Sequence, residues 1–188
     1  MSRRARIDRA AIVQAALSII DTEGLAGLSM RTLATRLDVK AASLYNHVTG
    51  KRALQQLIAD EVSTHVISAL TPGLGWRDLL DQFAGEIRSE LRTHPGAAQV
   101  LAVTDVSAEV YSPVIPIIVH AFAGHGVDDL EVLLTFSSLG VLVIGLAAAE
   151  FGDVPEPAVA PREYYDRWFA LAVGTFLDGV AVRLTSGE

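Results

Sequence analysis

A short polar segment between Lys40 and Lys51 carries residue types that can read nucleic-acid bases. If the segment is helical, its side chains are spaced by about 100°, so Leu44 and Val48 fall on one side. The remaining side chains are small or polar and uncharged: Ala42, Ser43 and Asn46 opposite, Tyr45 and His47 on the flanks, and Ala41 near the apolar side. Small side chains let a backbone approach base edges, while flanking lysines can bind phosphates. The pattern favours hydrogen bonding to double-stranded DNA.

A helix-turn-helix would position this segment. Asp8 and Ser29 are suitable N-caps, Gly24 is a suitable C′ residue, and Thr49 is expected to cap the helix that follows it. The apolar spacing predicts helices at residues 9–23, 30–37, 41–48 and 51–70, with a tight turn at residues 38–39. The second and third of these helices form the expected helix-turn-helix.

The rest of the chain is also expected to be helical, because no segment combines β-branched alternation with hairpin turns. Further helices are predicted at residues 76–93, 97–103, 107–123, 129–151 and 162–184, with a Pro-rich loop at 152–161. Pro113 and Pro116 should shorten or bend the 107–123 helix. The predicted fold class is all-α, with a three-helix DNA-binding domain at residues 1–52 and a larger helical body at residues 53–188.

The charge of the chain is unevenly distributed. The 188 residues carry a formal net charge of −7, yet residues 1–54 hold nine Lys or Arg against four Asp or Glu. This first segment is therefore +5 and the remainder −12. A basic head on an acidic body indicates that only the head contacts a polyanion.

No group of residues has the spacing of a catalytic or metal site. The absence of cysteine excludes disulfides, thiolate metal sites and cysteine nucleophiles. His120 and His125 are five residues apart, so they do not share a helix face as a metal-binding pair would. Asp105, near Ser107, is expected to cap a helix rather than to belong to a catalytic triad. We expect no enzymatic activity, no metal and no cofactor.

Two stretches resemble the tetracycline-repressor (TetR) family of transcriptional regulators. Residues 24–34, GLAGLSMRTLA, resemble the entry to the second helix of that family. Residues 44–48, LYNHV, followed by Lys51 and Leu54, resemble its recognition helix and the start of its fourth helix. Beyond residue 70 the resemblance is looser.

The resemblance implies roles for individual residues of the head. Tyr45 and Lys51 would contact phosphates, Arg31 would contact a base or a phosphate, and Ser43 and His47 would contact bases. The residues that differ from tetracycline repressor itself are Ala41, Ala42 and Asn46. These differences imply a different operator sequence.

The resemblance also implies an effector site in the body. Tetracycline repressor holds a magnesium–tetracycline complex through a histidine after a Gly-Ala step, and this chain has no histidine after Gly96-Ala97. That departure argues against tetracycline and against a metal. The central helices offer an apolar lining with few polar groups, which suits either a mostly apolar small molecule or a filled core. The candidate lining residues are Phe83, Ile87, Gln99, Val100, Val103, Thr104, Tyr111, Phe136 and Gly140.

The last two predicted helices carry more apolar surface than a monomer would bury. Residues 132–149 are uncharged and nearly long enough to cross a bilayer, but acidic residues flank them and no Lys or Arg does. We expect this helix to be buried by its own domain and by a partner subunit, with no membrane contact. The expected face of the final helix is Trp168, Phe169, Val173, Phe176, Leu177 and Val180. The prediction is a homodimer built on a four-helix bundle.

These observations predict a DNA-binding regulator, in its simplest form a repressor that a small-molecule effector releases from its operator. No signal-peptide cleavage site follows the first twenty residues, so a cytoplasmic location is expected. One alternative is a regulator that activates, or that responds to no small molecule. The other is a helical small-molecule-binding or interaction protein without operator-specific DNA binding, which the set of Arg31, Tyr45 and Lys51 disfavours.

Overall fold

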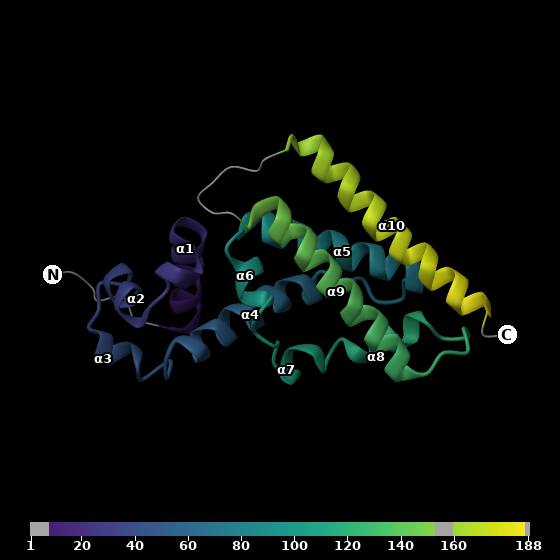
Figure 1. Ribbon diagram of the computed structural model, residues 1–188. Coiled ribbons are helices and arrows are strands. Elements are labelled where there is room, and N and C mark those ends of the chain that lie inside the picture. The colour runs from purple at the N-terminus through teal and green to yellow at the C-terminus, as the bar shows by residue number, and fades with distance from the viewer. Residues whose placement is uncertain (1–7, 153–159, 187–188) are drawn as a thin grey trace.

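The computed structural model describes residues 8–152 and 160–186, and this part of the chain consists of helices without strands. The helices are α1 (Arg9–Gly27), α2 (Met30–Arg36), α3 (Ala41–Leu44), α4 (Lys51–Ser68), α5 (Trp76–Thr93), α6 (Ala97–Leu101), α7 (Ala108–Tyr111), α8 (Ile115–Ala121), α9 (Asp129–Phe151) and α10 (Arg162–Ser186). The all-α prediction is confirmed. Helices α1–α3 form a head at one end of an elongated molecule, and α4 runs from this head into the body (Figure 1).

The first helix begins and bends where the sequence predicts. The Asp8 side chain accepts a hydrogen bond from the Ala11 N–H at 2.9 Å, which confirms Asp8 as the N-cap. Gly24 has φ 67° and ψ 175°, a conformation that favours glycine, and it interrupts the helix after Glu23. The residues up to Gly27 add a further helical turn. The buried side of α1 is Ile12, Val13, Ala16, Leu17, Ile19 and Ile20.

Helices α2 and α3 form the predicted helix-turn-helix. Ser29 Oγ accepts from the Thr32 N–H at 3.0 Å and caps α2, and Asp38 adopts φ 53° in the turn. Helix α3 is shorter than predicted because a turn follows Leu44. In this turn the His47 N–H donates to the Leu44 carbonyl three residues back, a 3₁₀-type hydrogen bond. The prediction that Thr49 caps α4 is wrong: Gly50 is the N-cap, and no side chain caps this helix.

Helix α4 is shared by the head and the body. Near its start, Leu54 and Ile58 are fully buried, and α4 packs there against α1. Further along, Val62 and Val66 are buried where α4 packs against α5 and α6. A single helix therefore contributes to the hydrophobic packing on both sides of the junction.

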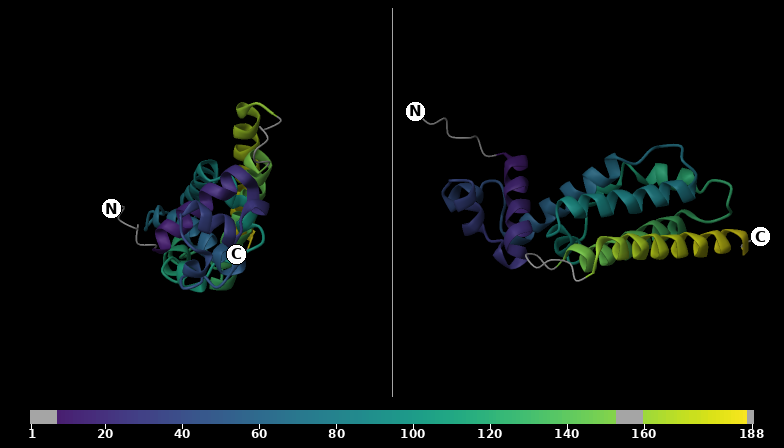
Figure 2. Two further views of the ribbon diagram at one scale, coloured as in Figure 1. Left: turned by 90° about the vertical axis from the view of Figure 1, so that its left-hand side faces the viewer. Right: turned by 90° about the horizontal axis from the view of Figure 1, so that it is seen from above.

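The body is built on the packing of α5 against α9, and α10 lies along the outer side of both (Figure 2). Arg88 of α5 donates two hydrogen bonds to Glu150 of α9 and pairs with Asp166 of α10 at 2.8 Å. Its guanidinium also lies 4.6 Å from the ring centre of Phe169. This one side chain thus connects three helices.

The predicted helix at 107–123 is divided into α7 and α8, which confirms the expected effect of its prolines. Pro113 follows α7 closely, and a proline cannot donate the N–H that a continuing helix requires. Pro116 lies in the first turn of α8, where that missing donor costs little.

Gly96 lies where the head contacts the body. The carboxylate of Asp21 in α1 accepts from the Gly96 N–H at 3.0 Å, and its other oxygen lies 2.9 Å from His94 Nδ1. A Cβ atom on Gly96 would lie 2.4 Å from the carbonyl oxygen of Ile20. Only glycine allows the two backbones to approach this closely.

We predict that Gly96→Ala lowers the free energy of unfolding by about 1–3 kcal/mol, because the methyl group forces α1 away from α6. The backbone of Gly96 (φ −63°, ψ −21°) suits alanine, so the cost arises from the contact alone. The matched control is Gly85→Ala in α5, where a Cβ would meet no atom within 4 Å. That change should stabilise the helix by about 0.5–1 kcal/mol. Urea unfolding measures both values, and an equal effect of the two substitutions would contradict this packing.

Candidate functional site

The exposed surface of the helix-turn-helix carries the residues that the sequence singled out for DNA contact. Leu44 is fully buried and Val48 is 2% exposed, so they fix α3 and its following turn against the head. Tyr45 is 53% exposed, which is unusual for so large an aromatic ring in a small domain. The exposed predicted residues are Arg31, Lys40, Ala41, Ala42, Tyr45, Asn46, His47 and Lys51, and Ser43 is half-buried. The structure therefore places all nine in or beside α2, α3 and the start of α4.

The cations of this surface differ in what they contact. Within the described residues, the side chains of Arg31 and Lys40 make no ion pair or hydrogen bond. Arg36, by contrast, donates to Ser18 Oγ at 2.7 Å and to Glu23 at 3.1 Å, and so holds α2 against α1. Arg31 and Lys40 are therefore available to an external anion.

Lys51 has a structural contact that the sequence did not reveal. Its Nζ donates a hydrogen bond to the carbonyl oxygen of Leu25 at 3.1 Å and so joins the start of α4 to the end of α1. An ammonium group has three donors, so this contact leaves two for a phosphate. Lys51 thus holds the start of α4 against the end of α1, and its ammonium group still places a positive charge at the N-terminus of α4.

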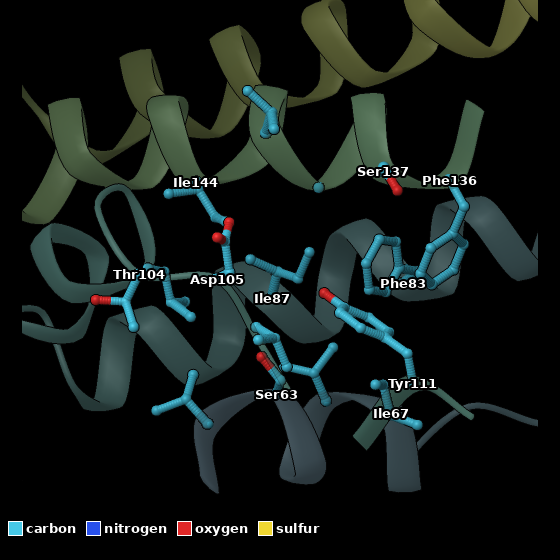
Figure 3. A pocket seen from close by; sticks show the side chains of 16 residues that line it. Ser63, Ile67, Phe83, Ile87, Thr104, Asp105, Tyr111, Phe136, Ser137 and Ile144 are labelled. Carbon is cyan, nitrogen blue, oxygen red and sulfur yellow. The ribbon is translucent and has the colours of Figure 1, made fainter. Parts of the chain in front are cut away.

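A cavity of about 320 Å³ lies in the body between α4, α5, α9 and the segment after α6 (Figure 3). Its walls are mostly aliphatic and aromatic: Val62, Ser63, Val66, Ile67, Phe83, Ile87, Leu101, Thr104, Asp105, Val106, Tyr111, Phe136, Ser137, Gly140, Val141 and Ile144. A volume of this size is in the range of small-molecule sites.

The cavity brings together most of the predicted lining residues: Phe83, Ile87, Thr104, Tyr111, Phe136 and Gly140. Gln99 is not among them, because its side chain donates to the Gly152 carbonyl at 3.0 Å. Val100 is fully buried outside the lining, and Val103 is 70% exposed. The reason is that α6 ends at Leu101, so only this last residue of α6 lines the cavity, and the chain that follows it closes the cavity.

Two aromatic rings form one wall. Phe83 of α5 and Phe136 of α9 stack with their ring centres 3.8 Å apart and their planes at 20°. Residue 140 lies directly beside this wall, since a Cβ on Gly140 would contact the Phe83 ring at 3.6 Å, an ordinary van der Waals distance. A large side chain at residue 140 would displace the ring or fill the cavity.

The sequence analysis missed three polar lining residues, Ser63, Asp105 and Ser137. Ser63 is only 9% exposed, and its hydroxyl has no hydrogen-bond partner among the described residues. Its place in the apolar stripe between Val62 and Val66 was a signal that the sequence offered. Burial raises the pKa of the Tyr111 phenol, so the ring presents a neutral hydroxyl to the cavity.

Asp60 connects α4 to the segment that closes the cavity. This carboxylate is 7% exposed and accepts from the Ser107 N–H at 2.9 Å, from Ser107 Oγ at 2.8 Å and from Gln56 Nε2 at 3.0 Å. Gln56 Nε2 also lies 2.6 Å from the Asp105 carbonyl oxygen. The sequence-based expectation that Asp105 caps a helix is wrong, because Ser107 is the N-cap of α7 and no side chain caps it. Residues 105–107 are instead held by α4.

The residues that the structure describes contain no cluster of three His, Cys, Asp or Glu side chains able to hold a metal ion. The chemistry that the cavity walls themselves offer is that of apolar contact, hydrogen bonding and, at Asp105, the charge of one carboxylate.

We predict that Asp60→Asn releases residues 105–107 from α4, because an amide nitrogen would face a backbone N–H or a hydroxyl donor. Loss of these buried bonds should lower the free energy of unfolding by about 1–3 kcal/mol. Hydrogen exchange of the Ser107 amide should accelerate more than that of the rest of the body. Glu109→Gln, which changes an exposed carboxylate on α7, is the control and should leave both values unchanged. Unaltered exchange in Asp60→Asn would contradict this role.

Comparison with known proteins identifies the head. Residues 12–57 match the family described as bacterial regulatory proteins, tetR family. An HTH-type transcriptional regulator of Saccharopolyspora erythraea is 34% identical over 139 residues, which cover 74% of this chain and 59% of that protein. The HTH-type transcriptional repressor DrrR1 of Streptomyces coeruleorubidus is 41% identical over 90 residues, 47% of this chain and 33% of that protein. The matches thus span between a third and three fifths of the length of these relatives.

Solved structures share the fold of head and body together. A TetR variant from Acinetobacter baumannii AYE, in complex with minocycline, has a TM-score of 0.81 at 21% identity and covers 95% of this chain and 99% of its own. BioQ with its double-stranded DNA operator has a TM-score of 0.69 at 24% identity and covers 92% of this chain and 99% of its own. The fold, the matched helix-turn-helix and the curated relatives agree: the chain belongs to the TetR family of bacterial regulatory proteins.

Proposed function

We propose that this chain regulates transcription by binding operator DNA, as a repressor that an apolar small-molecule effector releases. The observation that carries the proposal is the exposed polar face of α3, with the unpaired Arg31 and Lys40 beside it, joined by α4 to an apolar cavity. The relatives support it, since one is a transcriptional repressor and another was solved with its operator. No catalytic role is part of the proposal, and the expected location is the cytoplasm.

In this proposal residues 1–52 form the DNA-binding domain, and residues 53–188 form the ligand-binding and dimerisation domain. The base-reading residues are Ser43 and His47, with Ala41, Ala42 and Asn46 shaping the surface around them. Arg31, Lys40, Tyr45 and Lys51 contact the sugar-phosphate backbone and set the orientation of α3.

The proposed release begins at the segment that closes the cavity. An effector that contacts Thr104 and Tyr111 displaces residues 105–107, and the bonds from Asp60 transmit that displacement to α4. In a dimer the two α3 helices enter successive major grooves about 34 Å apart. Movement of α4 changes that separation, so the effector favours the state that cannot bind DNA.

A homodimer through α9 and α10 is part of the proposal. Both helices are long and apolar enough to cross a membrane, and both are only partly buried within the chain. Val173, Leu177 and Val180, expected at the interface, are instead buried within the chain. The large apolar side chains left exposed on these helices include Leu130, Leu134, Val141, Tyr164, Trp168 and Leu171. A second copy that packs α9 and α10 into a four-helix bundle would cover them without a membrane.

We predict that Lys40→Ala weakens binding to all DNA sequences alike and lowers the slope of log affinity against log salt by about 0.9, as loss of one phosphate contact requires. Lys40 is a cleaner test than Lys51, which also bonds to Leu25. Arg77→Ala, which removes a cation on α5 that pairs with Asp178, is the control and should keep the parent slope. Fluorescence anisotropy with labelled duplexes measures the slopes. Salt-independent binding, or none at all, would favour the alternative of a helical binding protein without operator recognition.

We also predict that Leu134→Glu converts the protein from a dimer to a monomer, since the new charge would be buried in the interface. Leu134 is 58% exposed on α9. Val103→Glu changes an apolar residue that is 70% exposed outside these helices and should leave the dimer intact. Sedimentation velocity at micromolar concentration distinguishes the states, and a monomeric parent protein would rule out this interface.

A further inference from the structure

Among the described residues, the cavity lining contains a single formally charged side chain, the carboxylate of Asp105. No Lys, Arg or His is among these described lining residues. The other polar groups are the hydroxyls of Ser63, Thr104, Tyr111 and Ser137, which are neutral. A ligand of this cavity therefore meets negative charge at one place and apolar or neutral polar surface elsewhere.

Within residues 8–152 and 160–186, the Asp105 carboxylate has no partner. Among the residues that the structure describes, its side chain makes no hydrogen bond and no ion pair. Its backbone is nevertheless fixed, because the Asp105 carbonyl accepts from Gln56 and the neighbouring Ser107 is bound to Asp60. The side chain extends from this segment toward α9 (Figure 3). A carboxylate without a partner among the described residues thus lines the cavity.

The position of Asp105 determines how a ligand would lie. Asp105 is an exposed lining residue, so we take the mouth of the cavity to lie beside it, whereas Phe83 and Phe136 are 5% and 3% exposed at the aromatic wall. The partnerless hydroxyl of the nearly buried Ser63 also faces the cavity (Figure 3). A molecule that matches this arrangement has an apolar, ring-containing part inside and a cationic group at the mouth.

The negative charge of the surrounding body also favours a cationic ligand. The chain beyond residue 54 carries a net charge of −12, so its field attracts cations and repels anions on approach.

We propose that the ligand class of this cavity is an alkyl amine that carries an apolar aromatic group, bound as its cation with the ammonium group on Asp105. This inference rests on the proposed function, because it names the chemical class of the effector at the same cavity. An ammonium group would replace water as the donor to this exposed carboxylate, and the apolar part would replace water along the aliphatic and aromatic walls.

Three naphthalene probes of similar size test the inference: 2-naphthylmethylammonium, 2-naphthylmethanol and 2-naphthoate. Calorimetric titration of the whole chain should show the ammonium probe binding about threefold to tenfold more tightly than the alcohol, as expected for one partly exposed charge pair. The carboxylate probe should bind more weakly than both. Asp105→Asn should reduce the affinity for the ammonium probe to that for the alcohol and leave the alcohol unchanged.

Two further variants distinguish a specific effect of Asp105 from a general effect of charge, and binding in this cavity from binding elsewhere. Glu109→Gln removes an exposed carboxylate of α7 that does not line the cavity, and it should retain the preference for the cation. Gly140→Phe should abolish binding of both the ammonium and the alcohol probes, because the added ring fills the cavity beside Phe83. If the parent binds all three probes equally, binds none of them, or keeps its preference in Asp105→Asn, the inference is overturned. Anisotropy with DNA is measured in parallel: cation-selective binding without any DNA binding would sustain this inference and defeat the proposed regulator.

Discussion

The structure depends on the burial of α4 along most of its length. Leu54 and Ile58 are covered by the head, whereas Val62 and Val66 are covered by the body. Close-packed interiors deform little, so a displacement at one half of such a helix is carried to the other half. The same helix begins with Lys51 at the proposed DNA surface and supplies Ser63 to the cavity wall. The connection between the two surfaces is therefore a single packed helix rather than a flexible linker.

Two buried or half-buried carboxylates, those of Asp21 and Asp60, also hold loops of the body against α1 and α4. Asp21 holds the turn before α6 against α1, and Asp60 holds the turn before α7 against α4. Both carboxylates accept backbone N–H groups, whose positions are set by the fold rather than by flexible side chains. Both carboxylates therefore have hydrogen-bond partners within the chain. Among the described residues, the side chains of Asp105, Arg31 and Lys40 have none. Within the described part of the chain, Arg31, Lys40 and Asp105 are thus charged groups of the proposed binding surfaces that have no internal partner.

Much of this arrangement could be predicted from the sequence, because it follows from local rules. Helical spacing identified Leu44 and Val48 as buried, and the caps at Asp8 and Ser29 follow from side-chain chemistry. Thr49 failed as a cap because α4 begins at Lys51, as predicted, and the residue directly before it is Gly50. The Thr49 side chain is therefore one residue too far from the first helix amides.

The cavity was harder to predict, because its walls come from distant segments. Phe83, Phe136 and Gly140 were recognisable from their place on long central helices. Gln99 and Val100 were assigned to the lining wrongly, since the end of α6 and the path of the following turn depend on tertiary packing. The lack of a partner for Asp105 is likewise visible only when its neighbours are known.

The central claim is that a symmetric pair of α3 helices reads DNA under the control of the body. The most direct measurement is selection of bound sequences from a random duplex pool, followed by hydroxyl-radical footprinting of the selected DNA. The account predicts an inverted repeat with two protected half-sites whose centres lie about one helical turn apart. Enrichment of no sequence, or protection of a single site without symmetry, would contradict it.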